Sequence, residues 1–237
     1  IFNNIYFLDT EKISIADIEV QLQQLNRDFL LENDTTEVLD SFQNKVGKAN
    51  IQFYLAKNTN SINYKRSDVA VFGNNDIYFD SLGGFSPVFP ERYLNIWVTN
   101  LLPGISGWAK NVFQDSLLEG VVIDYNYFGN SSISTRNMGR TLVHEVGHWL
   151  GLSHTWEIGC GIGDGINDTP NQENASSGCD LNKTSCSSLD MVQNFMDYSD
   201  DNCRLFFTQG QVDSMRFFIL ENKQDLITEG ANLGVST

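Results

Sequence analysis

Three histidines within one short stretch constrain this chain more than any other feature. They are His144, His148 and His154, and the 237-residue sequence holds 3 histidines in all. On a helix of about 3.6 residues per turn, His144 and His148 lie one turn apart on the same face. Two imidazoles placed in this way can bind one metal ion. His154 comes too late to share that face, so the chain has to turn back before it reaches this residue.

Gly151 lies where that turn is needed, because glycine adopts the positive φ that ends a helix. Three neutral imidazoles with an open fourth position are the ligand set of a catalytic zinc ion. Glu145 directly follows the first histidine and lies beside the metal-binding face, which makes it a candidate general base. His-Glu-x-x-His alone could be a solvated helix face. The added glycine and third histidine complete the longer signature of zinc peptidases.

The charge and composition limit the classes of partner that the protein can bind and its location relative to a membrane. The net charge is −15, from 30 acidic and 15 basic residues, so nucleic-acid binding is disfavoured because phosphates would be repelled. No apolar run of about 18 residues is present, so we expect no membrane span. The chain begins at Ile1 without a basic and apolar leader, which indicates a mature or trimmed form.

Four cysteines follow the histidine motif, and none forms a Cys-x-x-Cys pair, which argues against a structural zinc site. The segment around them is rich in Gly, Ser, Asn and Asp and lacks apolar periodicity. Two disulfides would stabilise such a segment by about 2–4 kcal/mol each. Disulfides indicate an oxidising compartment and hence a secreted protein. The spacing alone leaves three pairings open.

Apolar patterning before the motif predicts one sheet and one amphipathic helix. Ser14 has the position of an N-cap, and apolar residues follow it at spacings of three and four over 15–31, which is typical of a helix that packs on a sheet. Short apolar or alternating runs predict strands. These runs lie at 1–8, 51–55, 69–72, 77–79, 94–98 and 121–123, with a short edge strand near 105–110.

Two further helices are expected. The helix that carries the first two histidines should span 136–150. The last helix should begin at Thr208, which forms a capping box with Gln211. Strands and a helix before the motif, with irregular chain after it, predict two lobes with the metal between them.

From Val121 to about Phe218 the chain resembles the metzincin clan of zinc endopeptidases. Within that clan it is most similar to the pappalysin family, its ulilysin-like bacterial members in particular. The resemblance rests on the histidine stretch, on Thr155 directly after it, and on the sequence Asn-Phe-Met-Asp-Tyr at 194–198. The cysteine spacing and the stretch 207–211 are similar as well.

The resemblance implies a metzincin-like α+β catalytic domain over the whole chain, 1–237. The N-terminal lobe, 1–151, would hold a mixed twisted sheet, a backing helix and the active-site helix. The C-terminal lobe, 152–237, would be irregular and disulfide-stapled, with one helix. Met196 would form the Met-turn beneath the zinc, and Tyr198 would help to hold the tetrahedral intermediate. Ordinary core packing is the alternative for both residues.

The resemblance also implies a disulfide pairing, a second metal and a removed pro-segment. The disulfides would be Cys160–Cys186 and Cys179–Cys203. Calcium would bind in the loop after the zinc helix, where oxygen-bearing side chains suit a hard cation. A solvated acidic turn is the alternative for that loop. The candidate calcium ligands are Asp164, Asn167, Asp168 and Thr169.

These observations predict a secreted zinc endopeptidase in which Glu145 takes a proton from the attacking water. The polypeptide substrate would lie extended on an exposed edge strand around 105–110. Asp200 and Asp201 would favour Arg or Lys after the scissile bond, although the neutral Asn202 argues against this preference. The alternatives are a catalytically inactive binding or adhesion module and another zinc hydrolase such as an amidase. An inactive module would be expected to lack Glu145 or a ligand, and both are present.

Overall fold

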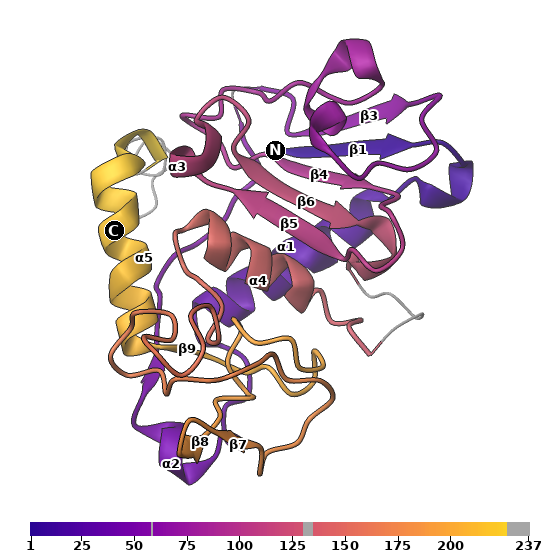
Figure 1. Cartoon of the computed structure of the whole chain (residues 1–237). Helices are drawn as coiled ribbons and strands as arrows, with labels where there is room; N and C mark the ends of the chain where they lie inside the picture. Colours follow the sequence, from indigo (N-terminus) through magenta and orange to yellow (C-terminus); the bar gives the residue numbers. More distant parts are fainter. Residues whose placement is uncertain (58, 130–134, 227–237) are drawn as a thin grey trace.

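A twisted five-stranded sheet forms the upper part of the molecule in Figure 1. In this computed structural model, which describes residues 1–57, 59–129 and 135–226, the strand order is β3-β1-β4-β6-β5. The first four of these run parallel, and β5 runs antiparallel to β6, so the sheet is mixed and β5 is an edge. The strands are β1 (Phe2–Tyr6), β3 (Ile62–Arg66), β4 (Ile96–Thr99), β5 (Gly107–Lys110) and β6 (Gly120–Asp124).

Two long helices, α1 (Ile15–Phe29) and α4 (Arg140–Trp149), cover one face of this sheet. Helix α1 begins at Ser14, whose side chain accepts a hydrogen bond from the Asp17 amide. Apolar residues of both helices and of the central strands belong to one buried cluster. A second cluster, with Trp97 and Tyr78 at its centre, covers the opposite face. The first two histidines of the motif are thus carried by a helix that packs on the core through its apolar side.

The C-terminal part of the chain is mostly irregular. Its elements are β7 (Thr184–Ser185), β8 (Ser188–Leu189), β9 (Phe207–Thr208) and α5 (Gln209–Asn222). A segment from the first half also packs here: β2 (Val46–Gly47) pairs with β9, and α2 (Asp40–Gln43) lies beside the β7–β8 hairpin in Figure 1. The short helix α3 (Val112–Asp115) connects β5 to β6. Within the described ranges, no helix has both the length and the apolarity needed to cross a membrane.

The α+β class and the mixed sheet agree with the sequence prediction, but some strands differ. Residues 51–55 form no strand, because Phe53 exchanges backbone hydrogen bonds with the Asn26 side chain while its ring packs on Phe29. A strand was expected at 77–79, but the first two of these residues belong to a 3-10 helix, Asn75–Tyr78. Conversely, β3 lies in a stretch where no strand was expected. β3 is an edge strand, and none of its residues is fully buried. Its sequence therefore lacks the apolar alternation that marks a strand with one buried face.

Candidate active site

The three histidine side chains converge at the end of α4. The Nε2 atom of His148 lies 3.0 Å from the Nε2 atoms of both His144 and His154. Four tetrahedral ligands at about 2.0–2.1 Å from a zinc ion are about 3.3 Å from one another, so this spacing suits zinc. Within the part of the chain that the structure describes, these three residues are the one group of His, Cys, Asp or Glu side chains close enough to share an ion.

Each imidazole is oriented through its other nitrogen. Nδ1 of His144 lies 2.8 Å from the Phe195 carbonyl, and Nδ1 of His148 lies 2.7 Å from the Leu152 carbonyl. Nδ1 of His154 lies 3.1 Å from a carboxylate oxygen of Glu157. These oxygens can only accept, so Nδ1 carries the proton in each ring and Nε2 offers its lone pair. Three lone pairs this close repel one another unless a cation lies between them.

Burial keeps these rings neutral, which is the protonation state that a metal ligand needs. It lowers the pKa of His144 well below its usual value, with His148 and Arg204 adding to the effect. Burial likewise lowers the pKa of His148 to about 4. The pKa of His154 is also lowered by burial, against the opposing effect of Glu157. The donor set therefore fits zinc in number, spacing and protonation.

Gly151 makes the turn that brings His154 back. Its φ is 90°, and it follows the last turn of α4. The Gly151 amide donates to the His148 carbonyl and the Leu152 amide to the Gly147 carbonyl, which is the Schellman pattern of helix ends. A side chain at Gly151 would also collide with the Phe218 ring, 2.8 Å from the position of its Cβ. The same turn places the Leu152 carbonyl that orients His148.

Glu145 lies on α4 beside the ligands and close to β5. A Cβ atom added at Gly107 would lie 3.3 Å from the Glu145 Cγ, so the glycine leaves room for this side chain. Burial raises the pKa of the Glu145 carboxyl to about 8, and the positive charges of Arg204 and Arg136 oppose this shift. A cation bound at the histidines would lower that pKa further and favour the carboxylate.

The edge strand β5 leaves part of its backbone unpaired. The Asp124 amide donates to the Ser106 carbonyl, so Ser106 faces β6. Residues of an antiparallel strand alternate between facing the partner and facing away. Trp108 and Lys110, which pair with Val122 and Gly120, therefore also face β6. The backbone groups of Gly107 and Ala109 point to the open edge.

Met196 is fully buried directly beneath α4. A Cβ atom at Gly147 would lie 2.5 Å from the Met196 sulfur, so a glycine in mid-helix is what lets this side chain approach. The Met196 amide donates to the Asn194 side chain, which exchanges two hydrogen bonds with Gln211 of α5. Helix α5 thus fixes the turn whose Phe195 carbonyl orients His144.

Tyr198 lies against the histidines. Its ring centroid is 5.3 Å from that of His144 and 5.0 Å from that of His154, and the residue is 39 % exposed. Burial and the Glu145 charge raise the pKa of Tyr198, so the hydroxyl stays protonated and can donate. The Trp156 ring stacks on His154, with centroids 4.5 Å apart, and contacts Tyr198 as well.

The three residues expected to shape the substrate pocket differ in how far they are buried. Asp201 is completely buried: one carboxylate oxygen pairs with Arg204, and the other accepts from the amides of Met138 and Arg140. Its charge is therefore compensated inside the protein. Asp200 is half-buried. Asn202 is exposed and lines a surface hollow together with residues of α1.

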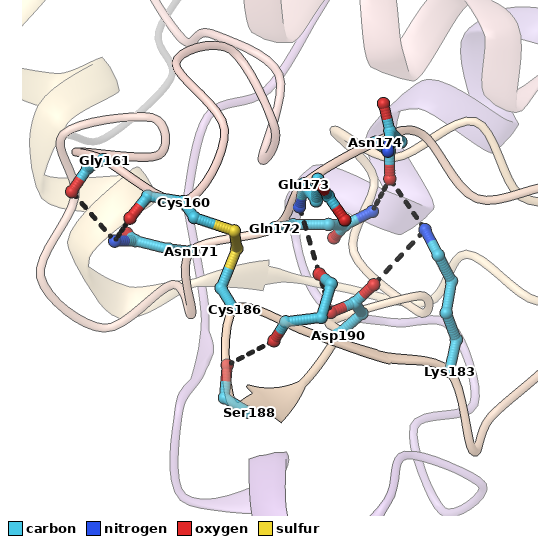
Figure 2. The surroundings of a disulfide bond; sticks show 11 residues. Cys160, Gly161, Asn171, Gln172, Glu173, Asn174, Lys183, Cys186, Ser188 and Asp190 are labelled. Carbon is cyan, nitrogen blue, oxygen red and sulfur yellow. Dashed lines mark hydrogen bonds and ion pairs between the residues drawn. A yellow bond between two sulfur atoms is a disulfide. The ribbon is translucent and has the colours of Figure 1, made fainter.

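Both disulfides lie in the irregular C-terminal part, and they are Cys160–Cys186 and Cys179–Cys203, the pairing that the resemblance implies. Figure 2 shows the first of them joining the loop after His154 to the β7–β8 hairpin. The Asn171 side chain donates to the Cys160 carbonyl, and Lys183 pairs with Asp190 close by. These contacts hold the loop that carries the third histidine and its neighbour Trp156.

The candidate calcium ligands do not form one group. Asp164 accepts from the Thr169 hydroxyl, and its other oxygen, Oδ2, is buried without a hydrogen-bond partner among the described residues. Asp168 instead accepts from Thr208 and from the Gly210 amide, so it caps α5. Asn167 is exposed.

Three residues near the site were not predicted: Trp156, Arg136 and Arg204. Trp156 follows the motif directly, and an aromatic residue next to a ligand could have drawn attention. No local pattern marks either arginine, since each reaches the site through the tertiary fold.

Comparisons with known proteins agree with this geometry. The family model described as pregnancy-associated plasma protein-A, peptidase M43, matches residues 88–220. An extracellular metalloprotease of Pyricularia oryzae is 45% identical over 127 residues, which cover 50% of this chain and 45% of that protein. Another from Verticillium alfalfae is 32% identical over 198 residues, covering 79% of this chain and 69% of the relative. The chain spans less than half the length of the first curated relatives that it matches.

Solved structures extend the likeness over the whole chain. Mature mirolysin of Tannerella forsythia in complex with a cleaved peptide has a TM-score of 0.92 and 36% identity, covering 100% of this chain and 97% of that chain. A promirolysin mutant of the same organism has a TM-score of 0.91 and 37% identity, covering 98% and 83%. The chain therefore belongs to the pappalysin family, peptidase M43, a family of zinc metalloendopeptidases with the metzincin fold.

Proposed function

We propose that this protein is a zinc-dependent endopeptidase that hydrolyses peptide bonds in polypeptides. The observation that carries the proposal is the convergence of the three Nε2 atoms. In each ring Nδ1 faces an oxygen acceptor, which leaves Nε2 without a proton. Zinc bound there lowers the pKa of a water molecule and polarises a carbonyl oxygen. The remaining steps belong to side chains of the chain itself.

Glu145 is the general base and then the general acid. Its carboxylate takes a proton from the attacking water and passes it to the nitrogen of the departing amine. Two features support this role. Glu145 is held beside the histidines by α4, and Gly107 leaves its side chain room to lie against the edge strand. Because Glu145 is not one of the three ligands, its carboxylate is free to exchange the proton.

Tyr198 donates a hydrogen bond to the oxyanion that develops on the substrate carbonyl. The raised pKa of its hydroxyl and its ring contacts with His144 and His154 support this assignment. Met196 places an apolar side chain beneath the site, where it contacts Gly147. The polypeptide substrate adds a strand to β5, because the backbone groups of Gly107 and Ala109 face the open edge.

The test is a cleavage assay on casein, with the wild-type protein and the Glu145→Gln variant purified side by side. Cleavage by the wild type alone supports the proposal. A wild-type protein that binds zinc but leaves casein and a broad peptide library intact would favour the rival, a binding or adhesion module with this fold.

We infer that the chain forms one catalytic domain, with the lobes 1–151 and 152–237 on either side of the metal. The cluster that contains Val146 and also Met196 and Met215 supports a single unit. We also infer action outside the cell after removal of a pro-segment. Two disulfides, the names of the extracellular relatives and the pro-form of mirolysin support this inference.

A preference for Arg or Lys after the scissile bond would depend on Asp200, since Arg204 compensates the charge of Asp201. Asp200→Asn is expected to lower the ratio of kcat/KM for an Arg peptide over a Leu peptide by about fivefold, because a partly solvated ion pair is worth about 1 kcal/mol. The measurement uses two peptides that differ at that single position. Asp213→Asn, an exposed carboxylate on α5, is the control and should leave the ratio unchanged. An unchanged ratio in Asp200→Asn would rule out this source of specificity.

A calcium ion would be held chiefly by Asp164, whose buried Oδ2 has no partner among the described residues and whose pKa burial raises. Thr169 and carbonyls of the same loop would complete the oxygen ligands. Calcium at 100 times its Kd should then stabilise the protein by about 2.7 kcal/mol. Thermal unfolding of the zinc-loaded protein measures this as a rise in Tm, and Asp164→Asn should abolish it. A wild-type Tm that stays the same when calcium is added would contradict the proposed calcium site.

A further inference from the structure

Arg136 contacts Tyr198 in two separate ways. Its Nη2 donates to the Tyr198 carbonyl at 2.9 Å, and its guanidinium carbon lies 5.6 Å from the centroid of the Tyr198 ring. A guanidinium within about 6 Å of an aromatic face is attracted to it. One side chain therefore holds both the backbone and the ring of the residue to which we assign the oxyanion contact.

The backbone that carries Arg136 is itself attached to the segment after Tyr198. The Asp201 amide donates to the Thr135 carbonyl at 3.1 Å, and the Met138 amide donates to the Asp201 carboxylate at 2.9 Å. The first turn of α4 joins them, since the Arg140 side chain donates to the Asp201 carbonyl at 2.6 Å. The position of Arg136 relative to Tyr198 is thus fixed from both sides.

The ring of Tyr198 needs such a contact. Trp156 and two histidines touch it, but no hydrogen bond from its hydroxyl is recorded within the described residues and 39 % of the residue is exposed. A partly exposed aromatic side chain can adopt more than one staggered χ1 rotamer. The guanidinium, which holds both the carbonyl and the ring face of Tyr198, restricts that freedom.

We propose that Arg136 is a positioning residue for the peptidase reaction, which holds the Tyr198 ring beside His144 and His154 so that its hydroxyl meets the oxyanion. The inference rests on the proposed role of Tyr198. A hydroxyl held in place gains more in the transition state than in the bound substrate, since the charge that it meets develops only then. Arg136 therefore acts on kcat and leaves KM largely unchanged.

A double-mutant cycle on the zinc-loaded protein tests this proposal. Tyr198→Phe should lower kcat about 100-fold, as expected for one oxyanion donor. Arg136→Gln should lower kcat about tenfold with KM changed less than about threefold. In the Tyr198→Phe background, Arg136→Gln should cost less than about twofold, because residues that act through each other are not additive. Arg136→Lys, which keeps the charge, should recover part of the loss.

Two further measurements complete the design. Arg66→Gln removes an exposed arginine paired with Asp9, and it should leave kcat unchanged. A crystal structure of Arg136→Gln should show the Tyr198 ring turned away while the histidines keep their positions. An equal loss of kcat in both backgrounds, or an unmoved ring, would overturn the role of Arg136. Full kcat in Tyr198→Phe would overturn it together with the role of Tyr198, while leaving the peptidase function and Glu145 in place.

Discussion

Replacing Glu145 by glutamine is expected to lower kcat by about 10³-fold, within the range of 10²–10⁴ that general acid–base catalysis contributes. Glutamine has the same shape and keeps the packing against Gly107, but its amide cannot accept the proton of the attacking water. Zinc content should equal that of the wild type, because Glu145 is not one of the three side chains that converge. Initial rates on a fluorogenic peptide, with the metal measured in the same samples, provide the test.

Glu157→Gln is the matched control for that substitution. Glu157 is half-exposed and its carboxylate accepts from Nδ1 of His154, a role that the oxygen of a glutamine side chain can also fill. Removing a residue that hydrogen-bonds a metal ligand typically lowers metal affinity or activity by about 10- to 100-fold. Glu157→Gln keeps the acceptor, so its loss of activity should be smaller than this. Near-normal turnover by Glu145→Gln would remove the general base from the mechanism.

Removing the metal is the second change with a large expected effect. A chelator should abolish cleavage and leave three unprotonated Nε2 atoms in close contact. If zinc is present at about 1000 times its Kd, its loss costs about 4.1 kcal/mol of stability. For a chain of this size that corresponds to a fall in Tm of about 8–16 °C. Calorimetry before and after chelation measures it, and added zinc should restore both Tm and activity.

His148→Ala provides the genetic counterpart. It removes the ligand that lies 3.0 Å from both of the others, so zinc binding and activity should be lost together. Its Tm should match that of the chelated wild type and should not rise when zinc is added. A chelated protein that still cleaves casein at the wild-type rate would contradict a metal-dependent mechanism.

The convergence of the three histidines could be predicted from the sequence because it depends on local features. His144 and His148 are related by helix geometry, and Gly151 marks the turn by its backbone freedom alone. The helix caps at Ser14 and Thr208 were readable for the same reason, since each cap is a bond over three residues. These features depend on neighbours in the chain and require no knowledge of the tertiary fold.

What the sequence did not predict depends on tertiary contacts. The apolar alternation at 51–55 suggested a strand, but these side chains pack on the core while Asn26 satisfies the backbone of Phe53. Asp201 read as a pocket acid, yet it is buried against Arg204 and the first turn of α4. Similarly, Arg136 reaches Tyr198 from 62 positions away in sequence. Spacing rules carry no information about such partners.

The most direct test of the central claim is anomalous diffraction at the zinc edge on crystals of the zinc-loaded protein. We predict one strong peak between the rings, with His144, His148 and His154 each bound through Nε2 at about 2.0–2.1 Å, and with Glu145 outside the first coordination sphere. A metal peak elsewhere, or a Glu145 carboxylate bound to the ion in place of one imidazole, would contradict the account.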